Sequence, residues 1–469
     1  QPSSHARQDA SDPGYPSFLA TFYYLRCITH NSGMAKYVCA FLIVAHLATL
    51  VAPSVLTDSN GRTHSGHLRG IRSRAELNNS MAVPPLVPIG PTTPIKFLIS
   101  SFQDGERCAN TLYQALKKAQ HPERITFNVL QAAGAEDAVC LEEFRGKQAP
   151  TICRMPDGNG FDHCMDTLLS KIHFKVIPLE AGEGPVHQRG LLSEFADLSG
   201  DGAMCLATDS HMDFAQGWDS DLLEDWASTG NEFAVLSAYP FATMQMEFSG
   251  AGGWIELCGY FLTSQGIPRG ATARPVLEGQ KMGTPQLTMN WAAGQSFARC
   301  HAEKNVPADK HLAWMFDGEE VNRAVRFWTH GYDLYNPRVS VVFHNYSNAV
   351  QKFWSYSKPN MEGEKRASEM RLKRLLQGEA STEVYGKYGL GDQRSLNQYV
   401  TWAHTDLGGK WGQFLAGQGI TPHFSDFVST GSYQPQGVPD FCNKLQRLPV
   451  RDRQVLMQSA MGQGAGAEL

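Results

Sequence analysis

The sequence carries no large excess of either charge. Its 469 residues include 41 Lys and Arg against 46 Asp and Glu, which gives a formal net charge of −5 at pH 7. A protein that binds nucleic acid through a dominant positive field needs a clear excess of basic residues. The balance therefore argues against that class, and we predict no nucleic-acid partner.

Several familiar signatures are missing as well. The chain has no internal repeat and no heptad run, and none of its ten cysteines forms a Cys-x-x-Cys pair, the usual sign of structural zinc. The glycine-containing segment at 182–185 lacks the spacing of a Walker loop and is too loose for a dinucleotide fingerprint. With 42% hydrophobic and 19% charged residues, the chain is typical of a globular protein of two or three domains.

The N-terminal part differs in composition from the rest. Residues 1–33 are poor in aliphatic side chains and are predicted to be a disordered leader. In residues 34–56, Met34 and Lys36 precede an apolar run that is shorter than the roughly 20 residues of a membrane span. This pattern predicts a secretory signal peptide or signal anchor, with a buried helix as the alternative. Residues 57–93, rich in Ser, Gly, Asn, Arg and Pro, are predicted to be a flexible stem.

From residue 94 the pattern becomes regular, and we predict a catalytic domain over 94–350 followed by a helical extension over 351–469 with a disordered end. Predicted strands alternate with predicted helices. The strands cover residues 95–102, 124–130, 173–179, 203–208 and 233–238, and the helices cover 106–119, 188–198, 321–330 and 361–376. Such alternation predicts an α/β fold with a mostly parallel central sheet and helices on both faces.

The most informative local motif is Asp209-Ser210-His211, which closes the predicted strand over 203–208. Side chains at i and i+2 at a strand end leave the sheet together, and a carboxylate with an imidazole can hold one divalent metal. His344 also follows a short strand-like run and is a candidate third ligand. A lone Asp-x-His triplet also arises by chance or as turn residues, so the motif gains weight only from its companions.

The motifs that add weight to Asp209-Ser210-His211 are acidic, glycine-containing and aromatic segments elsewhere in the chain. Glu319 and Glu320 follow Gly318 at the start of a predicted helix, where they either cap the helix or bind sugar hydroxyls. Arg189 lies in the helix after the 182–185 segment and is a candidate diphosphate contact or a surface ion pair. The segment from Trp291 to Phe297 is either a loop over a substrate or a buried turn.

Cysteine placement gives one further expectation. Cys153 and Cys164 flank a turn rich in Gly, Asp and Asn, and they are candidates for a disulfide in an oxidising compartment.

Taken in order, the motifs between about residues 95 and 399 resemble those of glycosyltransferase family 60, the polypeptide and hydroxyproline N-acetylglucosaminyltransferases. The segments that carry the resemblance are Ile99-Ser100-Ser101-Phe102-Gln103-Asp104, His121-Pro122-Glu123-Arg124-Ile125, Gly184-Pro185 with Arg189, Asp209-Ser210-His211 with Trp218-Asp219, Trp291-Ala292-Ala293-Gly294, Gly318-Glu319-Glu320, Trp328-Thr329-His330-Gly331-Tyr332-Asp333, and Gly389-Leu390-Gly391 with Arg394-Ser395.

The resemblance implies a GT-A-type nucleotide-sugar-binding domain that uses a divalent metal, Mn²⁺ above all, and UDP-N-acetylglucosamine (UDP-GlcNAc). It implies retaining transfer of N-acetylglucosamine to a protein hydroxyl, either hydroxyproline or Thr/Ser. The alternatives are a catalytically inactive sugar-binding protein on the same fold and an enzyme like the polypeptide N-acetylgalactosaminyltransferases. Metal-dependent hydrolysis is a third, with Asp213 as the nearby candidate base.

The resemblance also implies roles for individual residues. Asp209, His211 and His344 would bind the metal, and Glu319 and Glu320 would be the catalytic pair. The residues implied to bind the nucleotide sugar are Ser101, Asp104, Arg189, Asp209, Trp291 and Gly294.

Two features depart from the pattern of the family, and a third departs from that of the N-acetylgalactosaminyltransferases. Gln103 stands where the family commonly has Arg, and Glu320 stands where the N-acetylgalactosaminyltransferases have Asn. The apolar run in residues 34–56 is foreign to the cytoplasmic members of the family. It favours a single-pass Golgi membrane enzyme of the secretory pathway, attached only through that run, over a cytoplasmic one.

Overall fold

The computed structural model describes residues 87–403, apart from gaps at 155–159, 201, 249–253, 256, 258–259, 264, 271–274, 277–283, 348–352, 354–355 and 357. The predicted leader, the signal segment, most of the predicted stem and the end of the chain after 403 lie outside the described residues. All described residues belong to one unit, Ile71–Leu469. Within the described part of the chain, no helix combines the length and the apolar character that crossing a membrane requires.

An eight-stranded sheet forms the centre of the fold, in the order β12-β14-β6-β13-β4-β1-β2-β3. Its strands are β1 (Ile95–Phe102), β2 (Ile125–Ala133), β3 (Ile172–Pro178), β4 (Met204–Asp209), β6 (Ala234–Ser237), β12 (Gln286–Leu287), β13 (Ser296–Arg299) and β14 (Asp333–Asn336). Four neighbouring pairs are parallel and three are antiparallel. The sheet is therefore mixed, with β4, β1, β2 and β3 as its parallel half.

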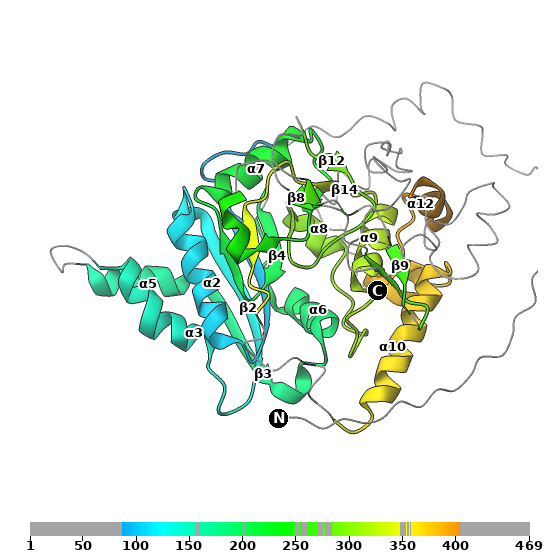
Figure 1. Ribbon diagram of the computed structural model, residues 1–469, viewed down its shortest axis with the longest axis horizontal. Helices are drawn as coiled ribbons and strands as arrows, with labels where there is room; N and C mark the ends of the chain where they lie inside the picture. Colours follow the sequence, from blue (N-terminus) through cyan, green and yellow to red (C-terminus); the bar gives the residue numbers. More distant parts are fainter. Residues whose placement is uncertain are drawn as a thin grey trace, which may run out of the picture. The chain divides into compact units, whose positions relative to one another are not determined.

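Helices cover both faces of the parallel half, as the alternating pattern predicts. Phe97 of β1 packs in one apolar cluster with residues of α2 (Gly105–Lys118) and α7 (Trp218–Ser228). Its neighbour Leu98 packs in another cluster with Leu192 of α6 (Pro185–Phe195). Figure 1 shows α2 and α6 on opposite sides of these strands. Successive strand residues point to opposite faces, so a strand covered on both sides is apolar throughout.

Aromatic rings fill the core between β1 and α7. The ring of Phe97 lies 4.9 Å from that of Phe127, 5.4 Å from that of Trp218 and 5.8 Å from that of Phe214, centroid to centroid. Tilted and edge-on pairs of this kind contribute about 0.5–1.5 kcal/mol each beyond the burial of their area. This cluster fixes the position of the strand whose end begins the candidate site.

The remaining elements surround this core. The other helices are α3 (Cys140–Glu143), α4 (Ala149–Ile152), α5 (Phe161–Ser170), α8 (Cys300–Asn305), α9 (Glu319–Thr329), α10 (Met361–Leu376), α11 (Thr382–Tyr385) and α12 (Leu396–Trp402). Shorter turns are η1 (Pro122–Arg124), η2 (Phe144–Gln148), η3 (Leu179–Ala181), η4 (Thr243–Phe248) and η6 (Gly386–Tyr388). A second sheet contains β5 (Met212–Phe214), β15 (Val342–His344) and β7 (Phe241–Ala242); β9 (Tyr260–Leu262) pairs with β10 (Pro268–Gly270), and β8 (Trp254–Ile255) pairs with β11 (Pro275–Val276).

Every strand predicted from the sequence is present within a few residues, and α10 has the predicted bounds 361–376. The α/β class is therefore confirmed, together with a helical region after residue 350. Among the described residues, three disulfides join Cys108 to Cys140, Cys153 to Cys164 and Cys205 to Cys300. The second is the pair that the sequence predicts, and the third ties β4 to the start of α8. Bonds of this kind typically stabilise a fold by about 2–4 kcal/mol.

A buried ion pair attaches α7 to the segment between α2 and β2. The side chain of Asp219 is fully buried, and its Oδ2 accepts a hydrogen bond from Arg124 Nε at 3.0 Å. The same carboxylate accepts hydrogen bonds from the backbone N–H groups of Gln120, at 2.6 Å, and His121, at 3.0 Å. Removing one partner of a buried pair leaves the other charge without compensation, which costs more than the pair itself contributes.

We therefore expect Asp219→Ala to lower the free energy of unfolding by about 3–5 kcal/mol, because Arg124 and two backbone donors lose their acceptor. Urea denaturation followed by far-UV circular dichroism measures the change. Glu224→Ala is the matched control, since Glu224 is an exposed carboxylate on the same helix. Equal stability of the two variants would contradict this role for the ion pair.

Candidate active site

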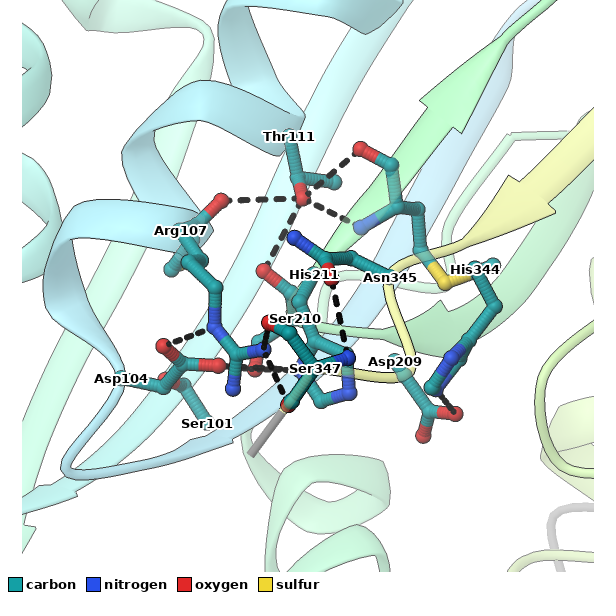
Figure 2. Close-up of polar contacts among 12 residues, drawn as sticks. Ser101, Asp104, Arg107, Thr111, Asp209, Ser210, His211, His344, Asn345 and Ser347 are labelled. Carbon is teal, nitrogen blue, oxygen red and sulfur yellow. Dashed lines mark hydrogen bonds and ion pairs between the residues drawn. The ribbon is translucent and has the colours of Figure 1, made fainter. Parts of the chain in front are cut away.

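The candidate site lies where two neighbouring parallel strands end. In the register of β1 and β4, Ser100 is opposite Asp209, so the segment after β1 and the segment after β4 emerge at the same edge of the sheet. Asp104 precedes α2 just beyond β1, and His211 follows β4. Figure 2 shows these side chains converging. The carboxyl ends of strands are where α/β sheets bind ligands.

His344 reaches the same place from far along the chain. It is the last residue of β15, and its register partner in the antiparallel strand β5 is Met212. The backbone N–H of Asn345 donates a hydrogen bond to the carbonyl oxygen of His211 at 2.9 Å. The pairing of these two short strands therefore carries His344 to the side of His211, with 4.5 Å between the ring centroids.

Asp209, His211 and His344 form a group suited to a divalent metal. One ligand atom from each residue lies within 4.8 Å of the corresponding atoms of the other two. His344 Nε2 lies 3.3 Å from Asp209 Oδ2. Two imidazoles and one carboxylate are a donor set that binds several divalent transition metals. The structure thus brings together the three residues that the sequence marks as metal ligands.

Asp104 orients His211. Its Oδ2 accepts a hydrogen bond from His211 Nδ1 at 2.9 Å, and its Oδ1 accepts one from Arg107 Nε at 2.7 Å. Burial acts to raise the pKa of Asp104, but the hydrogen bonds from His211 and Arg107 outweigh it and lower the pKa. A proton held on Nδ1 leaves Nε2 of His211 as a free lone pair, the form that binds a metal.

Thr111 of α2 fixes the loop that carries His211. Its hydroxyl oxygen accepts a hydrogen bond from the backbone N–H of Met212 at 2.8 Å, and the hydroxyl lies 2.9 Å from the carbonyl oxygen of Ser210. Figure 2 shows Thr111 among these backbone groups. The helix that follows Asp104 therefore holds both the orienting carboxylate and the backbone on either side of the imidazole.

Arg189 of α6 joins two acidic residues of the site. Its Nη2 donates to Asp209 Oδ1 at 2.5 Å, and its Nη1 lies 2.7 Å from both carboxylate oxygens of Glu319. Burial acts to raise the pKa of Asp209, but a hydrogen bond from His344 and the charge of Arg189 hold it far below its usual value. Asp209 is therefore ionised at neutral pH, as a metal ligand must be.

Glu319 and Glu320 begin α9, directly after Gly318, whose φ of 93° suits glycine. Neither residue is the N-cap of the helix, and their side chains contact the site instead. Glu320 Oε1 accepts a hydrogen bond from Tyr239 Oη, and Oε2 accepts one from the backbone N–H of Gly270 at 3.0 Å. Burial raises the pKa of Glu320 to about 7, although both hydrogen bonds act to lower it.

Two adjoining cavities surround these residues. The small cavity, of about 120 Å³, is lined by Ser100, Phe102, Asp104, Arg107, Gly184, Pro185, Gln188, Arg189, Asp209, Ser210, His211 and Phe353. The large cavity, of about 350 Å³, is lined by Pro185, Arg189, Asp209, His211, Tyr239, Pro240, Arg269, Ala293, Gly294, Phe316, Asp317, Gly318, Glu319, Glu320, His344, Tyr346 and Phe353. Asp209 and His211 line both, so the three-residue metal group lies at their junction.

Gly294 needs to be small for the large cavity to keep its shape. A Cβ atom at this position would lie 2.8 Å from Cδ of Pro240, inside van der Waals contact, and 3.7 Å from Oδ2 of Asp209. Its carbonyl oxygen also accepts a hydrogen bond from the hydroxyl of Thr208, next to Asp209 in β4. The glycine therefore permits a close approach of two loops beside the metal group.

Two of the sequence-predicted site residues line neither cavity. Trp291 is buried, its Nε1 donates to the hydroxyl of Ser296 at 2.8 Å, and the guanidinium of Arg323 lies 5.2 Å from its ring. Ser101 is buried as well, and its hydroxyl has no hydrogen-bond partner. Trp291 thus occupies a buried turn, the second of the two interpretations that its segment allows.

Other residues that line the cavities are not predicted by the sequence analysis. Tyr239 follows the predicted strand over 233–238, so a search of strand ends would have found it. Arg107 lies in the first turn of α2, and its i,i+3 contact with Asp104 is missed because the predicted helix begins at residue 106. Tyr346 and Phe353 have no local signal, because they reach the cavities through the pairing of β15 with β5 and through the chain that follows it.

Glu320 yields a prediction about stability and pH. Its pKa in the folded chain, about 7, exceeds the ordinary 4.5, so the folded state holds this proton more tightly than the unfolded state does. Stability from this group is then complete below pH 4.5 and is lost as the pH rises towards 7. Glu320→Gln cannot lose that proton, so we expect its stability relative to wild type to increase from pH 5 to pH 8. Urea midpoints at the two pH values measure this.

Glu362→Gln is the control for this measurement, because Glu362 is an exposed carboxylate at the start of α10. It should follow the wild type at both pH values. If Glu320→Gln does so too, Glu320 does not hold a proton in the way that its burial implies.

Comparisons with known proteins identify the family of the chain. The family model described as Glycosyltransferase (GlcNAc) matches residues 95–408, more than half of the chain. No curated protein matches the chain.

Among solved structures, the chain is similar to GalNAc-T7 with UDP, GalNAc and Mn²⁺, at 13% identity and a TM-score of 0.38, covering 70% of this chain and 55% of that one. It is also similar to the mannosyltransferase PcManGT from Pyrobaculum calidifontis in complex with GDP-Man and Mn²⁺, at 9% identity and a TM-score of 0.34, covering 73% and 79%. A third is S. aureus TarS 1-349 in complex with UDP-GlcNAc, at 10% identity and a TM-score of 0.34, covering 59% and 66%. The chain thus spans about half the length of the first of these.

The extent of the family match decides the assignment. It begins at the first residue of β1, runs through β4, α9 and β15, and ends after α12, so it contains every residue of the candidate site. The chain belongs to the GlcNAc glycosyltransferase family.

Proposed function

We propose that this glycosyltransferase is a metal-dependent, retaining enzyme of the GT-A type that transfers N-acetylglucosamine from UDP-GlcNAc to a protein hydroxyl. The observation that carries the proposal is the convergence of Asp209, His211 and His344 at the junction of two cavities, with Glu319 and Glu320 lining the larger one. A nucleoside-diphosphate sugar matches this arrangement. Its nucleoside and its sugar would each occupy one cavity, and the diphosphate between them would lie at the junction, beside the three candidate metal ligands.

The three ligands fit Mn²⁺ in donor type, since imidazole nitrogen and carboxylate oxygen both coordinate this ion. When bound, the metal neutralises the diphosphate leaving group as a Lewis acid. Contacts within the protein put the candidate ligands in the protonation states that metal binding requires. Asp104 fixes the tautomer of His211, and Arg189 with His344 keeps Asp209 ionised. Nδ1 of His344 is buried without a hydrogen-bond partner, so Nε2 is the nitrogen that faces the group.

The small cavity is the proposed pocket for the nucleotide. Gly184 and Pro185 begin α6 at its wall, and the N-terminus of a helix favours a phosphate through its unpaired N–H groups and its dipole. Arg107 and Arg189 add two guanidinium groups to the same lining. These positive groups would hold the diphosphate against the metal ligands.

The large cavity is the proposed pocket for the sugar. Its volume of about 350 Å³ falls in the usual range for small-molecule sites, about 300–1,000 Å³. Both candidate nucleophiles there are engaged, Glu319 by Arg189 and Glu320 by Tyr239 and Gly270. This engagement favours a same-face displacement, in which the acceptor hydroxyl attacks the anomeric carbon as the bond to the phosphate breaks, and the leaving phosphate takes the proton.

The acceptor is proposed to be hydroxyproline or Thr/Ser of a protein in the secretory pathway. Three disulfides in the described residues support an oxidising compartment, because such bonds are rare in proteins of the reducing cytosol. The predicted signal or anchor in residues 34–56 agrees with the same location.

The first test of this proposal is the release of UDP from UDP-GlcNAc and from UDP-GalNAc, with and without Mn²⁺, in the presence of hydroxyproline and Thr peptides. We expect Mn²⁺-dependent transfer from UDP-GlcNAc. His211→Ala and His344→Ala should each lower kcat/KM at least about a hundredfold, because loss of a mere hydrogen-bond partner of a ligand already costs about 10–100-fold.

His163→Ala is the control, because His163 is exposed on α5 and lines neither cavity. It should turn over at the wild-type rate. Absence of UDP-sugar binding with any metal would overturn the proposal. Transfer from UDP-GalNAc but not from UDP-GlcNAc would show that UDP-GalNAc is the donor.

A second prediction separates the orienting role of Asp104 from direct ligation. Asp104→Asn keeps the size of the side chain but removes the charge that holds the His211 proton on Nδ1. We expect Mn²⁺ to bind about 10–100-fold more weakly, with turnover restored at saturating Mn²⁺. Calorimetric titration with Mn²⁺ in the presence of UDP measures the affinity. Unchanged affinity would show that His211 is oriented by other contacts.

A further inference from the structure

A third cavity opens beside the large one. It measures about 310 Å³ and is lined by Thr263, Gln265, Ile267, Trp314, Met315, Phe316, Asp317, Phe353, Met361, Lys365 and Glu369. We call it the α10 groove. Three of these residues, Phe316, Asp317 and Phe353, also line the large cavity. The groove therefore adjoins the proposed sugar pocket, and these three residues lie between the two cavities.

One face of α10 forms a wall of the groove. Met361, Lys365 and Glu369 are spaced four residues apart and therefore follow one another along the same side of the helix. The same stripe continues into the core at the C-terminal end of the helix, where Leu372 and Leu376 lie in an apolar cluster with Val325 of α9. The wall is thus attached to the helix that carries Glu319 and Glu320.

The floor of the groove is apolar, and its edge is an exposed ring. Ile267 and Met315 are buried beneath it, whereas Phe316 remains 49% exposed at the point where the groove meets the large cavity. The guanidinium of Arg269 lies 5.6 Å from the centre of that ring. A half-exposed aromatic ring in a concave surface is a contact typical of a binding site.

The backbone that carries Phe316 is held in an unfavourable conformation. Trp314 has a φ of 62°, which residues with a side chain rarely adopt. Its backbone N–H donates to the carbonyl oxygen of Glu183 at 2.6 Å, and its indole Nε1 donates to Glu364 of α10 at 2.7 Å. Strain of this kind persists only where the surrounding structure enforces it, and it is concentrated at functional sites.

The lining of the α10 groove does not suit a phosphate. None of its described lining residues is an arginine, and its one lysine, Lys365, is offset by Asp317 and Glu369. The apolar floor, the exposed ring and the five polar or charged residues of the lining instead suit an extended polypeptide, whose backbone has polar partners while an apolar side chain faces inwards. Such a chain would place a neighbouring hydroxyl in the large cavity.

Because the groove adjoins the proposed sugar pocket at Phe316, we infer that the α10 groove binds the acceptor polypeptide, with an apolar residue next to the modified hydroxyl seated against Phe316. The inference rests on the proposed function, because it takes the large cavity to hold the donor sugar. It makes recognition of the acceptor depend on residues beyond the reacting one, so a peptide should be a far better acceptor than a single capped amino acid.

The test is to fill the groove without touching the sugar pocket. Glu369→Trp places a large ring on the groove wall, and Met370→Trp is the matched control, since Met370 is the next residue of the helix, is 59% exposed and does not line the groove. The rate of transfer is measured with Mn²⁺ and UDP-GlcNAc. For each acceptor residue, Thr or hydroxyproline, a long and a short acceptor are compared. These are a nine-residue peptide with one central Thr or hydroxyproline flanked by Val and Pro, and the corresponding N-acetylated amino acid amide.

We expect Glu369→Trp to raise KM for the peptide at least tenfold, and to leave KM for the capped amino acid and the affinity for UDP-GlcNAc within twofold. Met370→Trp should match the wild type in all three. Equal effects of Glu369→Trp on the long and the short acceptor, or none on either, would overturn the inference while the proposed function stands. Absence of donor binding in the wild-type protein would instead remove the proposed function, and the inference with it.

Discussion

The ion pairs of Arg189 with Asp209 and Glu319 are the interaction on which the site depends. One guanidinium from α6 joins the end of β4 to the start of α9, and the side chains of Arg189, Asp209 and Glu319 are 12%, 24% and 5% exposed. Charges withdrawn from solvent to this degree are tolerated only when each has its partners. The same contacts therefore hold the elements together and set the charge of Asp209, the proposed metal ligand. A change at Arg189 would alter both at once, so its effect on activity alone would be ambiguous.

The rest of the site is built outward from that centre by strand register. Ser100 opposite Asp209 puts Asp104 beside the end of β4, and His344 opposite Met212 puts an imidazole from a distant segment beside His211. A shift of either pair by one residue would turn the side chain to the other face of its sheet. The aromatic core under β1, and the disulfide from β4 to α8, keep those registers fixed.

An element or site residue could be predicted when neighbouring residues in the sequence indicate it, and not when only distant segments brought together by the fold do so. The strands and α10 follow from apolar periodicity, and Asp209 with His211 from a triplet at a strand end. Its place after a strand-like run makes His344 a candidate third ligand, but that it meets the other two follows only from the pairing of β15 with β5, which has no local signal. Trp291 illustrates the converse, since a small-residue loop between aromatics fits a substrate loop and a buried turn equally, and only packing around the ring decides.

One short segment links the donor side of the site to the α10 groove. Between Trp314 and Glu319 the chain contributes the strained backbone, the exposed ring of Phe316, the positive φ of Gly318 and the first carboxylate of α9. Trp314 is tied to α10 through Glu364, and Glu319 is tied to α6 through Arg189. A polypeptide that presses on Phe316 would therefore act on a backbone whose two ends are fixed. The same segment would thus contact the acceptor through Phe316 and the donor through Glu319.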